Sequence, residues 1–168
     1  MTRLCCISLA FFACACLPTV GPWVDSGQIV PEVDGGCSSA LECASGVCEA
    51  TACVAPASVC APAFAGCATF VDLTDPASVR VIRFGATERY APNCIRIRFG
   101  QTVTFQGGDF GVHPLSQSCG PVAGVLVASS GQSFTLTFNR GLGIFGYYCF
   151  AHGSPAGAGM AGAIEVVR

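Results

Sequence analysis

The sequence contains no lysine, only two histidines and, after the initiator, only one methionine. Every basic side chain is an arginine, the formal net charge is -2, and basic residues form no run. Proteins that bind nucleic acids carry clustered lysine and arginine on one face. The composition therefore excludes a nucleic-acid partner, and it limits any histidine-based metal site to very few residues.

Long apolar runs are also missing at the N-terminus. Residues 4–12 form an apolar stretch about half as long as the roughly 20 residues of a membrane-spanning helix. This stretch follows Arg3 and precedes small residues, which is the order of an export signal. We therefore expect residues 1–16 to be a signal segment and the protein to be exported, periplasmic or at the cell surface. Simple cleavage and lipid attachment at Cys14 or Cys16 both remain open.

Cysteine, in contrast, is abundant, with 13 residues in a chain of 168. Because a reducing cytosol keeps thiols reduced, this content favours an oxidising compartment. Residues 17–36 have the Pro, Gly and acidic content of a flexible linker. Six cysteines follow in residues 37–67, a segment with too few aliphatic side chains for its own core. We expect a disulfide-stapled segment there, and zinc is the weaker alternative because histidine and Cys-x-x-Cys pairs are missing.

Nine cysteines follow the signal segment, and an odd number leaves one thiol unpaired. The sequence indicates Cys149 as this thiol, so that the other eight can form four disulfides. Within residues 68–168 we expect a bridge from Cys94 to Cys119, with Cys67 as a competing partner for Cys94.

Short runs of alternating apolar and polar residues fill the chain from residue 68 onward. This pattern is typical of half-buried strands. The alternating runs are 69–73, 79–84, 95–99, 102–105, 133–138 and 164–166, and residues 124–128 and 144–150 are two further expected strands. Without any long helical period, they predict an all-β fold over residues 68–168, a Greek-key β-sandwich of about eight strands.

Alternation within these runs also predicts which side chains are buried. The expected core residues are Val81, Ile95, Ile97, Phe99, Val103, Phe105, Phe134, Leu136 and Phe138. Arg80, Arg96 and Arg98 fall between them and are expected on the surface.

The scarce histidines and methionine form one pattern with a cysteine. His113 comes first, Cys149 and His152 follow with Cys-x-x-His spacing, and Met160 comes last. Two imidazoles, a thiolate and a weak thioether suit a mononuclear blue-copper electron-transfer centre. We therefore expect His113, Cys149, His152 and Met160 to bind one copper ion, while zinc remains an alternative for a Cys/His/His set.

The residues around these ligands resemble the cupredoxin family. Residues 109–115 and 146–153 resemble its two ligand-bearing stretches, and residues 159–166 resemble its last strand. The resemblance covers 68–168 and implies a Greek-key sandwich with one type 1 copper. The ligand loop after His152 is longer than in the family. Separately, the cysteine spacing at the start of residues 37–67 resembles Dickkopf-like disulfide modules.

The resemblance implies a one-electron carrier rather than an enzyme, and no general acid, base or nucleophile outside the ligand set points to catalysis. We expect a monomer whose transient redox partner docks near His152, where Ala151, Pro155 and Ala156 would provide a small apolar surface. Two alternatives remain: a copper-binding or copper-buffering surface protein without redox turnover, and an interaction module built on the cysteine-rich segment.

Overall fold

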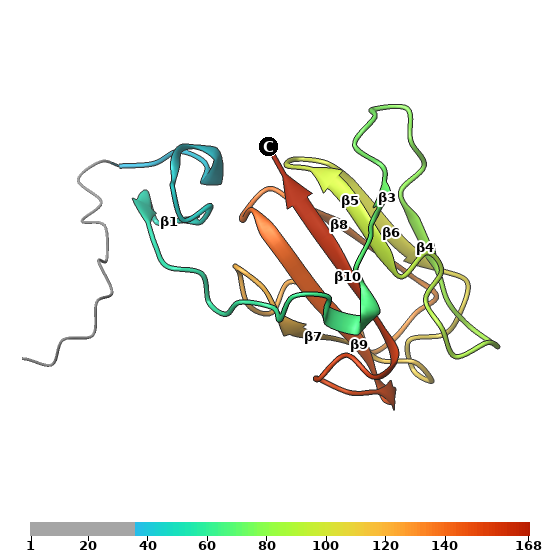
Figure 1. Ribbon diagram of the computed structural model, residues 1–168. Helices are drawn as coiled ribbons and strands as arrows, with labels where there is room; N and C mark the ends of the chain where they lie inside the picture. Colours follow the sequence, from blue (N-terminus) through green and yellow to red (C-terminus); the bar gives the residue numbers. More distant parts are fainter. Residues whose placement is uncertain (1–35) are drawn as a thin grey trace, which may run out of the picture. The chain divides into compact units, whose positions relative to one another are not determined.

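The computed structural model describes residues 36–168, and Figure 1 shows them as a β-rich structure. The predicted signal segment and nearly all of the predicted linker, residues 1–35, lie outside the described residues. The strands of the described part are β1 (Cys48–Glu49), β2 (Ala52–Cys53), β3 (Val71–Asp72), β4 (Val81–Arg83), β5 (Cys94–Arg98), β6 (Thr102–Gln106), β7 (Leu115–Cys119), β8 (Ser133–Thr137), β9 (Gly143–Gly153) and β10 (Gly159–Val167). Two 3₁₀ turns, Ala40–Glu42 and Phe64–Gly66, are the only helical elements in this part of the chain.

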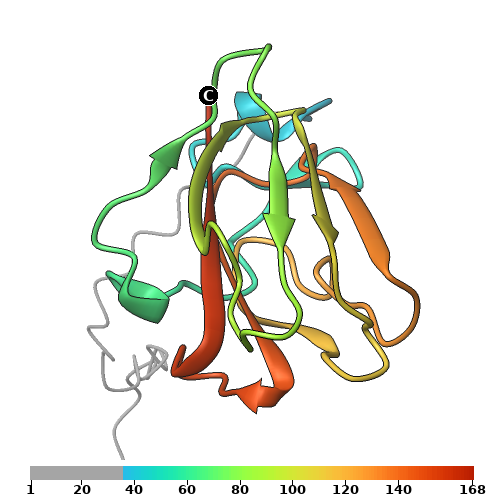
Figure 2. The ribbon, with the colours of Figure 1, turned by 90° about the vertical axis from the view of Figure 1, so that its right-hand side faces the viewer.

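Eight strands, β3 to β10, form two sheets. The larger sheet has five strands in the order β3-β5-β10-β9-β7, and the smaller has three in the order β4-β6-β8. From β3 to β8 consecutive strands alternate between the sheets, and Figure 2 shows the three strands of the smaller sheet side by side. The predicted all-β sandwich of about eight strands is therefore confirmed.

The alternating pattern explains the pairing of β6 with β8 in the smaller sheet. The apolar residues Val103 and Phe105 on β6 are fully buried. The alternate residues Thr102 and Thr104 face outward. Their hydroxyls form hydrogen bonds with the hydroxyls of Thr137 and Thr135 on β8. Threonine pairs of this kind are a common stabilising contact between antiparallel strands.

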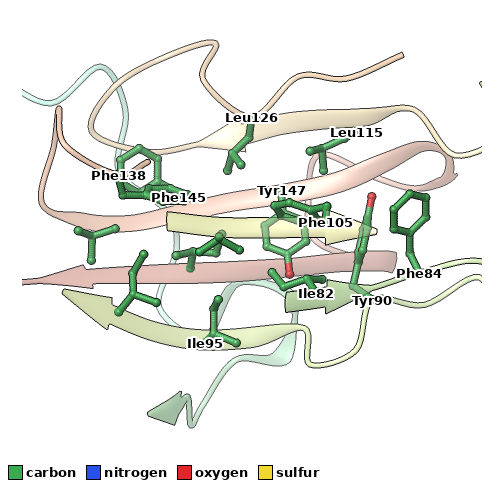
Figure 3. Packing of buried hydrophobic residues seen from close by; sticks show 14 of the residues in the cluster. Ile82, Phe84, Tyr90, Ile95, Phe105, Leu115, Leu126, Phe138, Phe145 and Tyr147 are labelled. Carbon is green, nitrogen blue, oxygen red and sulfur yellow. The ribbon is translucent and has the colours of Figure 1, made fainter. Parts of the chain in front are cut away.

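The core lies between the two sheets and is rich in aromatic rings. Figure 3 shows these side chains meeting between the strands. The largest fully buried residues are Tyr147, Phe105, Phe110, Phe145, Ile82, Ile95, Ile97, Leu115, Leu126, Met160, Ile164 and Val47. Of the nine residues predicted for the core, eight are buried or packed against it as expected, and β4 supplies the exception.

On β4 the predicted phase is wrong. Ile82 is fully buried and Phe84 nearly so, whereas Val81 is only half-buried and Val79 is 77% exposed. Residues 79–84 contain two alternating sets of apolar residues, Val79 with Val81 and Ile82 with Phe84. The set with the larger side chains, Ile82 and Phe84, faces the core. Burying Ile and Phe removes more apolar surface from water than burying two valines, which favours this phase.

Residues 124–128 do not form the predicted strand; they form a loop with only an isolated bridge from Ala128 to Leu115. Their apolar character reflects burial of Leu126. Their backbone is held instead by Gln117 on β7, a strand that the pattern did not predict. The Gln117 side-chain oxygen accepts hydrogen bonds from the amides of Val125 and Leu126, at 2.9 and 3.3 Å.

Four disulfides occur in the described part, and Cys149 is its one free cysteine, as the odd count predicts. The pairs are Cys37–Cys48, Cys43–Cys53, Cys60–Cys119 and Cys67–Cys94. Two of these pairs close inside the cysteine-rich segment, and the other two join it to the sandwich.

The expected Cys94–Cys119 bridge is wrong, and the competing partner Cys67 holds Cys94. Cys94 lies on β5 and Cys119 on β7, and β10 and β9 run between them. Three strand spacings amount to about 14 Å, whereas a disulfide needs Cα atoms within about 7 Å.

In residues 36–168 no helix has the length and apolar character needed to cross a membrane.

Candidate metal centre

His113 is positioned by a tight turn in front of β7. The carboxylate of Asp109 accepts a hydrogen bond from the Gly111 amide at 2.8 Å, and the Asp109 carbonyl accepts one from the His113 amide at 2.9 Å. Asp commonly organises turns in this way. Phe110, within the turn, is fully buried, which anchors the turn and leaves the His113 side chain only 8% exposed.

Cys149 and His152 both come from β9, the longest strand. Cys149 is fully buried and pairs in register with Leu115 of β7, directly after the His113 turn. The three side chains meet at this end of the sandwich. His113 Nδ1 lies 3.1 Å from His152 Nδ1, and Cys149 Sγ lies 3.4 Å from His152 Nδ1 and 3.9 Å from His113 Nδ1.

The spacing of these three atoms fits a single metal ion. Metal–nitrogen bonds of about 2.0–2.1 Å and metal–sulfur bonds of about 2.3 Å place neighbouring ligand atoms roughly 3.1–3.8 Å apart at ordinary bond angles. The observed separations of 3.1, 3.4 and 3.9 Å fall at or close to this range. His113, Cys149 and His152 are also a group whose ligand atoms lie within 4.8 Å of one another.

Met160 lies on β10 in the same core cluster as Cys149 and is 1% exposed. Together with His152 it lines a hollow at this end of the sandwich. Gly159 precedes it with a φ of +70°, and a Cβ there would strike the His152 carbonyl. Glycine is needed at this position because both the left-handed backbone and the close approach exclude a side chain.

The backbone amides beside Cys149 are already engaged. The Phe150 amide donates to the Pro114 carbonyl at 2.8 Å, and the Leu115 amide donates to the Ala128 carbonyl at 2.8 Å. Pro114 itself has no N–H. A thiolate at Cys149 therefore receives no hydrogen bond from these three neighbouring backbone positions.

Two residues that the sequence did not indicate also lie at the site. A carboxylate oxygen of Glu88 is 3.6 Å from His152 Nε2, so the outer edge of this imidazole faces an acidic side chain. Tyr90 lines the same hollow, which has a volume of about 580 Å³. Both residues come from the loop between β4 and β5, whose sequence carries no ligand motif.

Tyr90 has the one buried side-chain oxygen or nitrogen without a hydrogen-bond partner among the described residues. An unsatisfied buried hydroxyl costs about 1–3 kcal/mol. Burial raises the pKa of Tyr90 well above its usual value, and the charge of a nearby Cys149 thiolate raises it further. The phenol therefore stays protonated and is available as a donor.

The aromatic residues next to the ligands differ in burial. Phe110 and Tyr147 are fully buried beneath it. Phe150, however, is 71% exposed, because alternation along β9 turns it outward when Cys149 points inward. Phe150 therefore contributes to the outer surface next to the site.

Comparison with solved structures finds cupredoxins. The purple cupredoxin from Nitrosopumilus maritimus is 22% identical, with a TM-score of 0.38 over 52% of this chain and 98% of that one. An oxidized mutant of amicyanin is 21% identical, with a TM-score of 0.41 over 58% of this chain and 90% of that one. Because these TM-scores are low, the similarity is no evidence for the fold. The fold is established by the strand order and packing of this chain. No protein-family model and no curated protein matches the sequence.

Proposed function

We propose that this protein is an exported type 1 copper protein that carries single electrons. The observation behind the proposal is the meeting of two imidazole Nδ1 atoms and one buried thiol sulfur within 3.9 Å at one end of the sandwich. Such a site, closed by a weak thioether, suits copper that alternates between Cu(I) and Cu(II). His113, Cys149 and His152 would hold the ion, and Met160 would be the weak axial ligand.

The surroundings of the site support electron transfer with little reorganisation. His113 is fixed by the Asp109 turn, Cys149 by its strand pairing, and Met160 by the core. A ligand set held by packing and hydrogen bonds keeps its geometry when the charge of the ion changes. We propose no catalytic activity for the chain.

The surface beside the site supports docking of a transient redox partner. Phe150 directly follows Cys149 and is 71% exposed, and Val112 directly precedes His113 and is 57% exposed. Ala151 and Pro155 are also exposed nearby. Weak electron-transfer encounters bury small areas, and a few apolar side chains next to the ligands would suffice for one.

Export is supported by the disulfides. Eight of the nine cysteines in the described residues are paired. Disulfides of this density form and persist in oxidising compartments. We propose a periplasmic or cell-surface location, with lipid at Cys14 or Cys16 as one mode of attachment.

The test is a titration of the purified protein with Cu(II), followed by visible spectroscopy and voltammetry. We expect an intense thiolate-to-copper charge-transfer band that saturates at one ion per chain, and a reversible one-electron couple. A colourless complex that prefers zinc would contradict the copper assignment. Tight binding of Cu(I) without an accessible Cu(II) state would instead support a copper-buffering role.

A further inference from the structure

Glu88 lies in the middle of the loop that joins β4 to β5. Arg83 and Ala91 close this loop with two backbone hydrogen bonds of 2.8 Å. Inside the loop, the buried rings of Phe84 and Tyr90 pack against each other and anchor it to the core. Glu88 has a φ of 49°, a left-handed conformation that is uncommon for residues other than glycine. The fold of the loop therefore determines where the Glu88 carboxylate lies.

The two ring nitrogens of His152 have different surroundings. The carboxylate oxygen Oε1 of Glu88 lies 3.6 Å from His152 Nε2. This separation is that of an ion pair and is slightly longer than a hydrogen bond. The other nitrogen, His152 Nδ1, faces His113 Nδ1 at 3.1 Å and Cys149 Sγ at 3.4 Å. An acidic side chain thus contacts the nitrogen that points away from the other candidate ligands.

The negative charge of Glu88 is not neutralised by an arginine. Arg89 lines the same hollow, yet the ion pairs within residues 36–168 are only Arg96 with Glu165 and Glu88 with His152. The Glu88 side chain is 63% exposed, so solvent and salt screen part of its charge. We therefore expect its effect on the site to be moderate and to depend on salt.

A carboxylate at Nε2 decides which nitrogen of a neutral imidazole carries the single proton. It favours the proton on Nε2, which leaves the lone pair of Nδ1 free for a metal ion. Carboxylate partners of metal-binding histidines fix the tautomer and the ring orientation in this way. A bare Nδ1 on His152 also explains both of its short contacts, because it can accept hydrogen bonds from His113 Nδ1 and from the Cys149 thiol.

We infer that Glu88 is a positioning residue of the metal centre, which holds His152 with Nδ1 toward the ion and favours Cu(II) over Cu(I). It acts through His152 and does not bind the ion. Because the oxidised ion carries one more positive charge, a nearby carboxylate stabilises it more than the reduced ion and lowers the reduction potential. This inference rests on the proposed copper site.

The test compares Glu88→Gln with Glu49→Gln as a matched control. Both changes replace an exposed carboxylate with an amide of similar size, and both change the net charge equally. Glu49 lies far from the site. Val47, two residues before it, pairs with Gly141 just before β9 begins, whereas His152 is near the end of that strand. The 11 residues of β9 span about 35 Å.

The copper-loaded variants should differ in affinity and in potential. In Glu88→Gln we expect the affinity for Cu(II) to fall by about tenfold, the lower end of the range for such partners. The affinity for Cu(I) should change little, so a tenfold loss corresponds to a rise of about 59 mV in the reduction potential. The rise should shrink at high salt. Glu88→Asp keeps the charge and should stay closer to the wild-type potential, and Glu49→Gln should match the wild type.

The metal-free protein gives a second readout. NMR of its imidazole nitrogens, at a pH where imidazole is neutral, reports which nitrogen of each ring carries the proton. We expect the His152 proton on Nε2 in the wild type. In Glu88→Gln we expect a larger share of the form that is protonated on Nδ1.

The outcomes separate this inference from the proposed function. A wild-type protein without a thiolate-to-copper band would overturn the copper site and the inference together. With a normal wild-type band, an unchanged potential in Glu88→Gln would overturn the inference alone. An equal rise in Glu49→Gln would also overturn it, since net charge would then explain the shift. So would a metal-free wild type in which the His152 proton sits on Nδ1.

Discussion

The cysteine-rich segment, residues 36–67, and the sandwich, residues 68–168, are stabilised by different means. The sandwich buries a continuous core of aromatic and aliphatic side chains. The segment buries few apolar residues besides its cysteines, chiefly Val47, which joins the sandwich core, and Phe64. A short stretch with so little apolar surface gains its stability from covalent cross-links.

The cysteines of the cysteine-rich segment and of the sandwich also have different roles. In the segment every cysteine is in a disulfide, and two of these bonds reach into the sandwich, at Cys94 and Cys119. At the far end of β9, Cys149 remains a buried thiol beside two imidazoles. The two disulfides satisfy the remaining sandwich cysteines, which keeps Cys149 free for a metal.

Replacing this one free thiol should have the largest effect. In Cys149→Ser we expect complete loss of the charge-transfer band, because the band arises from the sulfur. The sandwich should stay folded, since serine is close to cysteine in volume. Visible spectroscopy and circular dichroism measure the two properties. A copper-loaded variant that keeps its colour would falsify the assignment of Cys149.

Removing a disulfide that joins the two regions should have the next largest effect. Cys60→Ala combined with Cys119→Ala opens a link between residues 59 positions apart. Loss of a cross-link over such a distance should lower the free energy of unfolding by about 4 kcal/mol. Urea unfolding followed by circular dichroism measures this change.

The matched control removes a disulfide inside the segment. Cys43→Ala combined with Cys53→Ala opens a link between residues only 10 positions apart. We expect faster proteolysis around β1 and β2, while the urea midpoint of the sandwich changes much less. Equal losses of sandwich stability in both double variants would show that the segment and the sandwich unfold as one unit.

The sequence predicted strands where one face is apolar and the other polar, as on β5, β6 and β8. It failed where this rule does not hold. On β7 only Leu115 is buried, and the half-buried Gln117 two residues later binds loop amides through its side chain, so the strand lacks an apolar stripe. On β4 both faces carry apolar residues, and only packing between the sheets selects Ile82 over Val81.

The candidate ligands could be found because their residue types are scarce and fall in one pattern. The structure brings His113, Cys149 and His152 together, with Met160 buried nearby. Tyr90 and Glu88 had no such signal. Their relation to the site depends on how the loop between β4 and β5 folds over the end of β9, and on which polar atoms are left without partners.

Changing Met160, the proposed axial ligand, should alter the centre without destroying it. In Met160→Leu we expect copper and colour to be retained and the reduction potential to rise, because loss of a thioether donor disfavours Cu(II). Leucine has a similar volume, so the core around β10 should tolerate it. Voltammetry measures the shift. An unchanged potential would indicate that Met160 belongs only to the core and that another group occupies the axial position.

The smallest effect is expected for a charge pair on the surface of the sandwich. Arg96 on β5 donates from Nε to Glu165 on β10 at 2.5 Å, and the Glu165 carboxylate raises the pKa of Arg96 through this hydrogen bond and its charge. Both side chains are partly exposed, so Glu165→Gln should lower the free energy of unfolding much less than the loss of the Cys60–Cys119 disulfide does. The difference should shrink further at high salt, which screens exposed charges. Urea unfolding at two salt concentrations measures it. A loss comparable to that of the disulfide variants would mean that surface charge, and not the aromatic core, holds β5 against β10.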